Sequence, residues 1–299
     1  MWRLLPAYFV VMLLMASVHS QNIENSWANI LYINNFLPIQ QQFMPWTWSL
    51  AIEEQFYIIF PFLILLIFRS QYPLTILISL LVLSFVIRYL LVIYYQFQLP
   101  LPFHEVLNKE LHYQYFDKIY DKTYARYGGL IIGVLAAYGM IYRNWVEYLN
   151  RRLLLRRSLL LITVLLLLAY LRVPTLVENV TVNETALLLA LFRNVFSLAI
   201  GYLILYSLTI QGRNNFIIRC FSGKFWYPIA QLSYSAYLIH LMVVAGIAIN
   251  RYQDLKPSFM LVISLIFITS LLSLSLAAII FITVEKPLLQ LRNCYFPRV

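Results

Sequence analysis

Residues 46–61 read WTWSLAIEEQFYIIFP and place two adjacent carboxylates, Glu53 and Glu54, inside an otherwise apolar segment. The apolar run around them, 47–68, is long enough to cross a bilayer, which takes about 20 residues. A charge at the centre of a membrane helix costs roughly 2.5–3.5 kcal/mol on insertion scales, so such charges are rarely without a role. The two carboxylates therefore predict either a buried ion pair that joins two helices or a polar cavity within the membrane.

The composition predicts an all-α, multi-pass membrane protein. Of the 299 residues, 62% are hydrophobic and only 11% are charged, and the mean hydropathy is +0.76. A soluble domain has about 25% charged residues, so a soluble fold is excluded. We expect one membrane domain over residues 1–299. Its predicted spanning helices are 4–18, 47–68, 74–95, 127–142, 158–171, 186–209, 229–250 and 259–282.

The net charge of +10 reflects topology rather than a nucleic-acid partner. Most of the lysines and arginines lie in the segments that share a side with the two termini, above all in 143–157. Cytoplasmic loops carry such an excess of basic residues. Both termini are therefore predicted to be cytoplasmic, and the segments 19–46 and 96–126 extracytoplasmic. The basic segment itself is either a contact with anionic lipid or part of a site for a phosphate-bearing donor.

Three arginines are predicted at the same depth as the two glutamates. Arg88 and Arg193 fall in the outer halves of their helices, and Arg126 opens the next helix from the outside. If the five charges paired with one another, one positive charge would remain. An anionic or polyhydroxylated substrate would fit that charge.

Glycines follow Arg126 closely. Gly128, Gly129 and Gly133 lie near the start of one predicted helix. Small residues allow helix backbones to approach closely in membranes. A tight helix contact is therefore predicted beside Arg126.

The seventh predicted helix carries a polar face within QLSYSAYLIH, residues 231–240. Ser233, Tyr237 and His240 are spaced by four and three residues, so they share one side of the helix. A histidine at this depth either forms a structural hydrogen bond to a neighbouring helix or handles a proton near neutral pH. Cys220 and Cys294 form no metal-site pattern with the histidines, and no metal is expected.

Four strings resemble the acyltransferase-3 family of multi-pass membrane acyltransferases. They are WTWSLAIEEQFYIIFP at 46–61, RLLPAY at 3–8, LSYSAYLIH at 232–240 and VEKPLLQL at 284–291. The resemblance implies transfer of an acyl group, often acetyl, from cytoplasmic acyl-CoA to a hydroxyl of an extracytoplasmic carbohydrate or lipid-linked glycan. Acyl-CoA would be a donor substrate and no cofactor would stay bound. The resemblance also implies a cell membrane, with the bacterial cytoplasmic membrane as the expected location.

The resemblance assigns roles to residues on these strings. Glu53 and Glu54 would shape the reaction cavity, and Arg3 would remain from the donor site. Arg126 and His240 would approach the acceptor. The other candidate substrate-binding residues, taken from the helix faces described above, are Arg88, Arg193, Ser233 and Tyr237.

The chain also departs from the family pattern. The family has two further helices upstream, with its presumed catalytic histidine on the first, and His19 does not match that position. We therefore expect a chain that is shortened at its N-terminus and inactive as written. The alternative function is a transporter or flippase that moves a sugar or lipid-linked substrate without chemistry. Intramembrane charges suit that alternative, but the inverted repeats typical of transporters are not visible.

Overall fold

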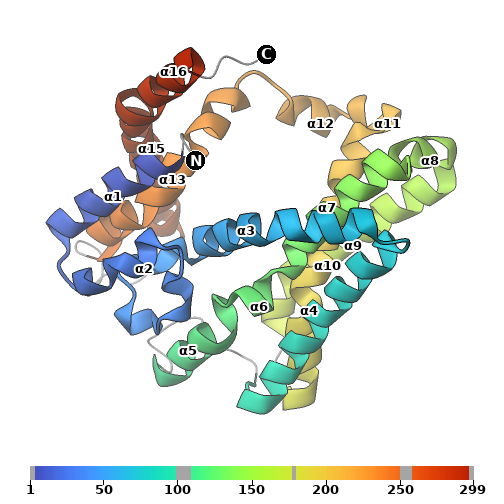
Figure 1. The fold of residues 1–299 in the computed structure, drawn as a ribbon, viewed down its shortest axis with the longest axis horizontal. Coiled ribbons are helices and arrows are strands. Elements are labelled where there is room, and N and C mark those ends of the chain that lie inside the picture. The colour runs from blue at the N-terminus through green and yellow to red at the C-terminus, as the bar shows by residue number, and fades with distance from the viewer. Residues whose placement is uncertain (1–3, 99–108, 177–179, 250–257, 296–299) are drawn as a thin grey trace. The chain divides into compact units, whose positions relative to one another are not determined.

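The computed structural model describes residues 4–98, 109–176, 180–249 and 258–295. Throughout these ranges the ordered elements are helices and there is no strand, which confirms the all-α prediction (Figure 1). The chain divides into two compact units. The larger unit is Glu24–Cys220, and the smaller unit combines Met1–Ile23 with Phe221–Val299.

Six helices are long and apolar enough to cross a membrane. They are α3 (Trp48–Arg69), α4 (Pro73–Tyr95), α9 (Leu153–Leu176), α10 (Val182–Leu208), α13 (Trp226–Val244) and α15 (Phe259–Ile280). In each, only 11% to 22% of the most apolar stretch is buried by protein. So much uncovered apolar surface requires lipid around it. The chain is a multi-pass membrane protein.

The expected number of eight spanning helices was wrong. The first predicted span, α1 (Leu4–Val18), has 15 residues, which reach about 22 Å against the roughly 30 Å of the hydrocarbon core. The fourth, α7 (Gly128–Tyr142), also has 15 residues and is followed by α8 (Trp145–Arg151) at a bend of 72°. If that bent pair is one broken span, the described residues contain seven.

The bend between α7 and α8 has a local cause. Asn144 connects the two helices with a φ of 51°, a left-handed conformation that ends α7. The Trp145 indole then folds back onto Gly139, where an added Cβ atom would overlap the ring. Glycine at this position therefore allows the sharp turn.

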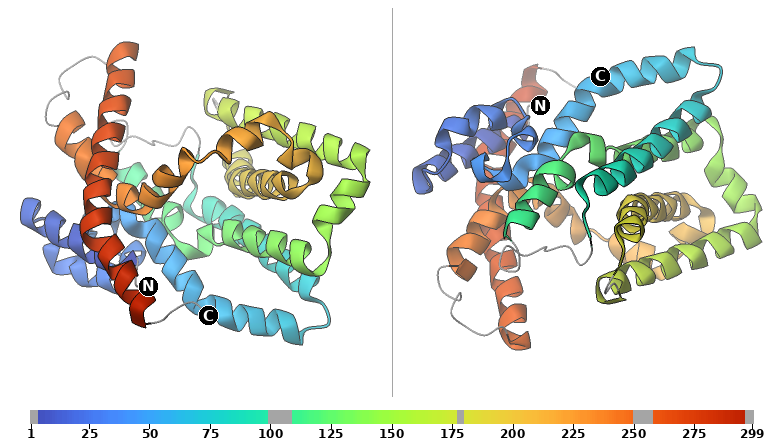
Figure 2. Two further views of the ribbon diagram at one scale, coloured as in Figure 1. Left: turned by 90° about the horizontal axis from the view of Figure 1, so that it is seen from above. Right: turned by 90° about the horizontal axis from the view of Figure 1, so that it is seen from below.

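In the larger unit, α10 packs against α4, α7 and α9, and α4 also contacts α7 (Figures 1 and 2). A capping box starts α10, because the Thr181 hydroxyl accepts from the Glu184 amide and the Glu184 carboxylate accepts from the Thr181 amide. Pro73 opens α4, and Gln96 closes it in a left-handed conformation. After α10 come the short helices α11 (Ile210–Arg213) and α12 (Phe216–Phe221).

A cap of short helices joins the spans of the larger unit at one end. Its first half is η1 (Ile23–Asn25), α2 (Ser26–Ile30), η2 (Asn34–Phe36), η3 (Ile39–Gln41) and η4 (Pro45–Thr47). Its second half is α5 (Lys109–Tyr115), the π-helix η5 (Phe116–Tyr120) and α6 (Thr123–Arg126). An apolar cluster that includes Val92, Phe97, Tyr115 and Ile119 fixes the second half to the end of α4.

In the smaller unit, α13 packs on α15, and α1 contacts both α13 and the π-helix η7 (Phe281–Glu285). The remaining elements are the π-helix η6 (Ala245–Ile249) and α16 (Lys286–Tyr295). The Tyr234 hydroxyl donates to the Leu4 carbonyl at 3.0 Å, and the buried Ser235 hydroxyl donates to the buried Glu285 carboxylate. Helices that carry residues 4–8, 232–240 and 284–291, which belong to three of the four strings that suggested the family, therefore contact one another in this unit.

Candidate functional site

A cavity of about 420 Å³ lies within the larger unit and is lined by Arg88, Arg126 and Arg193. We call it the arginine cavity. The three arginines come from α4, α6 and α10, and Tyr115 and Tyr120 of the cap form part of the wall. The structure thus brings together the three cationic residues that their predicted depths had suggested.

Arg88 is held by backbone carbonyl groups. It is 2% exposed, and its guanidinium donates to the carbonyl oxygens of Ala125, Leu189 and Ala190. These bonds connect α4 to both α6 and α10. Arg88 therefore builds the wall of the cavity, and its donors are already engaged.

Arg126 and Arg193 still have donors without a partner. The Arg126 guanidinium lies over the Trp48 and Tyr120 rings, at 4.3 and 4.4 Å from their centroids, and its Nε donates to the Tyr120 carbonyl. The Arg193 guanidinium lies 5.1 Å from the Tyr120 centroid. Nη2 of Arg126 and Nη1 of Arg193 are buried and have no hydrogen-bond partner within the described ranges. These two atoms are the vacant donors of the cavity.

The charges in the cavity repel one another. Burial, and then the positive charge of Arg193, lower the pKa of Arg126 to about 9. The guanidinium still carries its charge at pH 7, so the cavity holds neighbouring cations at an energetic cost. Across residues 4–98, 109–176, 180–249 and 258–295, no acidic side chain forms an ion pair with any of the three arginines. An anion bound here would relieve that repulsion.

Glu53 and Glu54 are not part of this cavity. On α3, Glu53 is exposed and Glu54 is half-buried, and neither forms an ion pair or hydrogen bond within the part of the chain that the structure describes. The predicted convergence of these two glutamates with the three arginines is therefore absent from the larger unit. Their catalytic role stays a prediction.

The same segment anchors the cap through residues that the sequence did not single out. Gln55 donates to the Tyr32 carbonyl at 2.7 Å and to the Asn35 side chain at 2.9 Å, and it accepts from the Thr123 hydroxyl. The Thr47 hydroxyl, fully buried, accepts from Asn29 at 2.9 Å. Gln55 is an amide side chain directly after two glutamates in an apolar span, and that position could have marked it as a hydrogen-bonding residue.

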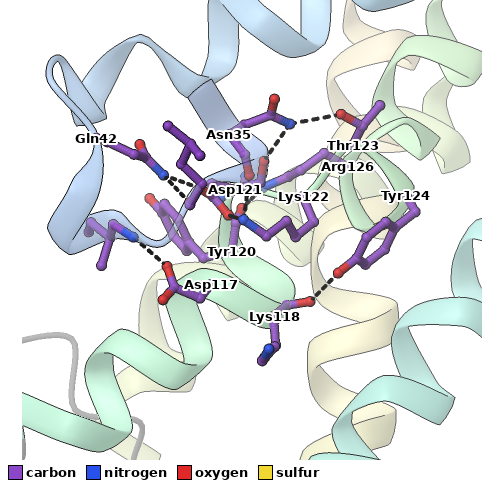
Figure 3. Close-up of polar contacts among 12 residues, drawn as sticks. Asn35, Gln42, Asp117, Lys118, Tyr120, Asp121, Lys122, Thr123, Tyr124 and Arg126 are labelled. Atoms are coloured by element: carbon purple, nitrogen blue, oxygen red, sulfur yellow. Dashed lines mark hydrogen bonds and ion pairs between the residues drawn. The ribbon is translucent and has the colours of Figure 1, made fainter. Parts of the chain in front are cut away.

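The two halves of the cap are joined by a buried polar network, drawn in Figure 3. Asn35 donates to the Asp121 carbonyl at 3.2 Å and to the Thr123 hydroxyl at 2.9 Å. Gln42 donates to the Asp121 carboxylate at 2.9 Å, and Lys122 pairs with the same carboxylate at 2.9 Å. This network fixes residues 121–123, which directly precede Arg126, and so helps to position that arginine in the cavity.

The stability of the cap is expected to depend on Asp121. Burial, opposed by Lys122, raises the pKa of the Asp121 carboxyl from its ordinary 3.8 to about 6. Between these values the folded protein holds a proton that the unfolded chain has released, so stability falls as the pH rises from about 4 to about 6. The loss is at most about 3 kcal/mol, and it is complete above the folded pKa.

Thermal unfolding in detergent between pH 4 and 7 measures this effect, with Asp121→Asn as the comparison. Asn keeps the shape of the side chain but does not titrate in this range. The melting temperature of the natural protein should fall relative to Asp121→Asn as the pH rises. A constant difference between the two proteins across the window would contradict the assignment.

The smaller unit has a second polar cavity, of about 460 Å³, between α13 and α15. It is lined by Ser233, Tyr237 and His240, the three residues predicted to share one helix face. On the facing helix, Thr269 and Ser270 add hydroxyl groups to the wall. We call this the histidine cavity.

The geometry of His240 fixes where its proton lies. Nδ1 is 2.6 Å from the Tyr237 carbonyl oxygen, which can only accept. Nδ1 must therefore carry the hydrogen in the neutral ring, and Nε2 is left with its lone pair. A ring in this state can take a proton from a hydroxyl group.

Three further expectations concern Arg3, metal binding and the basic segment 143–157. Arg3 lies outside the described residues. The described residues contain no group of three or more metal-binding side chains that could hold an ion, and the thiols of Cys220 and Cys294 are free. Arg156, in the basic segment 143–157, is buried and donates to the carbonyls of Leu149 and Asn150. It therefore stabilises the connection between α8 and α9.

Comparison with known proteins agrees with this architecture. A sequence model of a protein family, described as an acyltransferase domain, matches residues 1–284. A curated relative, the nose resistant to fluoxetine protein 6 of Caenorhabditis elegans, is 25% identical over 327 aligned positions. That match covers 98% of this chain but only 39% of the relative, so the chain spans about two fifths of that relative's length. No solved structure matches the chain. The chain belongs to the acyltransferase-3 family of membrane proteins.

Proposed function

We propose that this chain transfers an acyl group from acyl-CoA to a hydroxyl of a carbohydrate or lipid-linked glycan. This proposal replaces the expectation of an inactive chain, because His240 offers a base in place of the family's upstream histidine. The family match over residues 1–284 supports acyl transfer in general. The donor, the acceptor and the direction from a cytoplasmic donor to an extracytoplasmic acceptor are the proposed part. Acyl-CoA acts as a substrate that leaves after each turnover.

One observation carries this proposal: the arginine cavity has vacant, buried donors on Arg126 and Arg193. A cavity of a few hundred Å³ with a small number of convergent polar groups is typical of a small-molecule site. Guanidinium groups bind carboxylates and phosphates through paired hydrogen bonds. We assign this cavity to substrate binding, with Arg88 as the residue that holds its wall together.

His240 is the proposed base. Its Nε2 takes the proton of the acceptor hydroxyl while the oxygen attacks the thioester carbonyl of acyl-CoA. The resulting tetrahedral oxyanion collapses, the C–S bond breaks, and the thiol leaves with one proton. Ser233 and Tyr237 line the same cavity and are proposed to orient the acceptor. Glu53, Glu54 and Arg3 keep the roles that the family resemblance gives them.

Radiolabelled acetyl-CoA, supplied to the purified protein in lipid nanodiscs with a membrane-lipid extract as acceptor, tests the proposal. His240→Gln should lower kcat by about 10²–10⁴-fold, the usual contribution of a positioned base. Arg193→Gln should act mainly on KM, raising it about tenfold or more, because it removes a charged hydrogen bond to the substrate.

Two matched controls separate these effects from general damage. His19→Gln and Arg69→Gln change the same residue types at exposed positions outside both cavities, and they should leave both constants unchanged. Transfer by His240→Gln at the natural rate would refute the assigned base. Passage of unmodified substrate through the membrane, without hydrolysis or transfer of the label, would favour the transporter alternative.

A further inference from the structure

An apolar groove adjoins the arginine cavity on the outside of the larger unit. It lies between α9 and α10, measures about 160 Å³, and is lined by aliphatic and aromatic side chains without a charged group, among them Leu166, Ala169 and Leu191. Leu191 is 41% exposed, and Ala169 is exposed as well. Within the larger unit, this face of α9 and α10 is therefore available to the hydrocarbon of the membrane.

The groove and the cavity share one wall of aromatic residues. Tyr170, Phe192 and Phe196 line both spaces. The Tyr170 ring stacks on Phe192 with centroids 3.7 Å apart and lies 4.6 Å from Phe196. Arg193 follows Phe192 directly and lines the cavity. A single turn of α10 thus separates an uncharged, largely apolar surface from a cationic one.

A cationic cavity next to an apolar groove fits an amphiphilic molecule with a small, negatively charged headgroup. The vacant donors of Arg126 and Arg193 suit a phosphate, whose oxygens accept from planar guanidinium groups. The groove suits a hydrocarbon chain, since each buried CH₂ contributes about 0.8 kcal/mol. Neither a free sugar nor a free phosphate would use both surfaces.

We propose that the arginine cavity and the groove together bind a membrane lipid with a phosphate headgroup, with the phosphate on Arg126 and Arg193 and one acyl chain between α9 and α10. This inference deepens the proposed function and rests on it in one respect, because it identifies the substrate held by the arginine cavity as lipid-borne; it concerns the larger unit alone and involves no contact with the histidine cavity. Binding itself does not depend on whether transfer takes place.

The test is photocrosslinking of the purified full chain with phosphatidic acid that carries a photoreactive group on one acyl chain. The label should attach to α9 or α10, and phosphatidic acid should compete at least about tenfold better than phosphatidylcholine. Arg193→Gln should weaken binding about tenfold, and Arg193→Lys, which keeps the charge, should restore part of it.

Two tryptophan substitutions on α9 test the groove. Ala169→Trp fills it and should reduce labelling about tenfold, since the chain loses its buried surface. Leu168→Trp adds the same bulk to an exposed position that does not line the groove, and it should have no effect. Both positions are exposed, so neither change disturbs the packing of the unit.

Three outcomes would overturn the inference. Equal labelling by phosphatidylcholine would indicate ordinary boundary lipid. Binding of inorganic phosphate that is unaffected by Ala169→Trp, with no preference for lipid, would indicate a free-anion site. Palmitoyl-CoA that binds at these residues where phosphatidic acid does not would make this the donor site. Lipid binding without acyl transfer in the nanodisc assay would instead refute the proposed function and leave this inference standing.

Discussion

Replacement of Arg88 by Met is expected to remove most of the folded protein. Arg88 is nearly fully buried and donates to three carbonyl oxygens on two other elements. Met fills the volume but offers no donor, so the carbonyls of Ala125, Leu189 and Ala190 would lose a charged partner. Hydrogen bonds to charged groups contribute about 1.5–3 kcal/mol each, so we expect a loss of at least about 3 kcal/mol.

The measurement is the yield of monodisperse protein after detergent extraction and a heat step, read by size-exclusion chromatography. Arg193→Met is the matched control, because it removes a guanidinium from the same cavity whose Nη1 has no partner. That variant should retain its fold while losing ligand binding. Equal yields from Arg88→Met and Arg193→Met would show that Arg88 does not hold the helices together.

Replacement of Gly128 by Ala is expected to destabilise the larger unit by about 1–3 kcal/mol, the usual range for overpacking. An added Cβ atom would lie 2.5 Å from Oδ1 of Asn194 and 2.6 Å from Oγ of Ser84. Both side chains are buried, and Asn194 donates to Ser84 at 3.1 Å, so neither can move without breaking that bond. Asn194 also lines the arginine cavity, so the change should reduce ligand binding too.

Gly133→Ala on the same helix is the control. Nothing lies within 4 Å of the added atom, and alanine favours a helix over glycine by up to about 1 kcal/mol. The two substitutions should therefore shift the melting temperature in opposite directions. Asn194→Ala in the Gly128→Ala background should recover part of the loss. A shift of the same sign and size for both single variants would refute the close contact at Gly128.

The sequence predicted the positions of intramembrane charges better than their partners. Depth along each helix was enough to place Arg88, Arg126 and Arg193 near one another, because each helix rises by a fixed distance per residue. The same argument placed Glu53 and Glu54 at that depth, but it does not specify the direction in which a helix face points. In the structure Glu53 is exposed and does not line the arginine cavity.

Contacts between distant segments explain most of what the sequence did not predict. The cap depends on Gln55, Asn35 and Thr123, which are far apart in the chain and belong to no spacing pattern. Glu285 is fully buried against Ser235, 50 residues earlier in the chain, and no spacing pattern predicts that contact. By contrast, the face of Ser233, Tyr237 and His240 follows from local helical periodicity, and the structure places all three on one cavity.

The construction of the smaller unit from both ends of the chain has a consequence for biosynthesis. The hydroxyl that meets the Leu4 carbonyl belongs to Tyr234, which is 230 residues further along the chain. At translation rates of about 5–20 residues per second, roughly 10–50 seconds pass between the synthesis of Leu4 and the synthesis of Tyr234. During this time α1, already short for a membrane helix, has neither α13 nor η7 to pack against. The native contacts of α1 with α13 and η7 can therefore form only after the C-terminal part of this unit has left the ribosome.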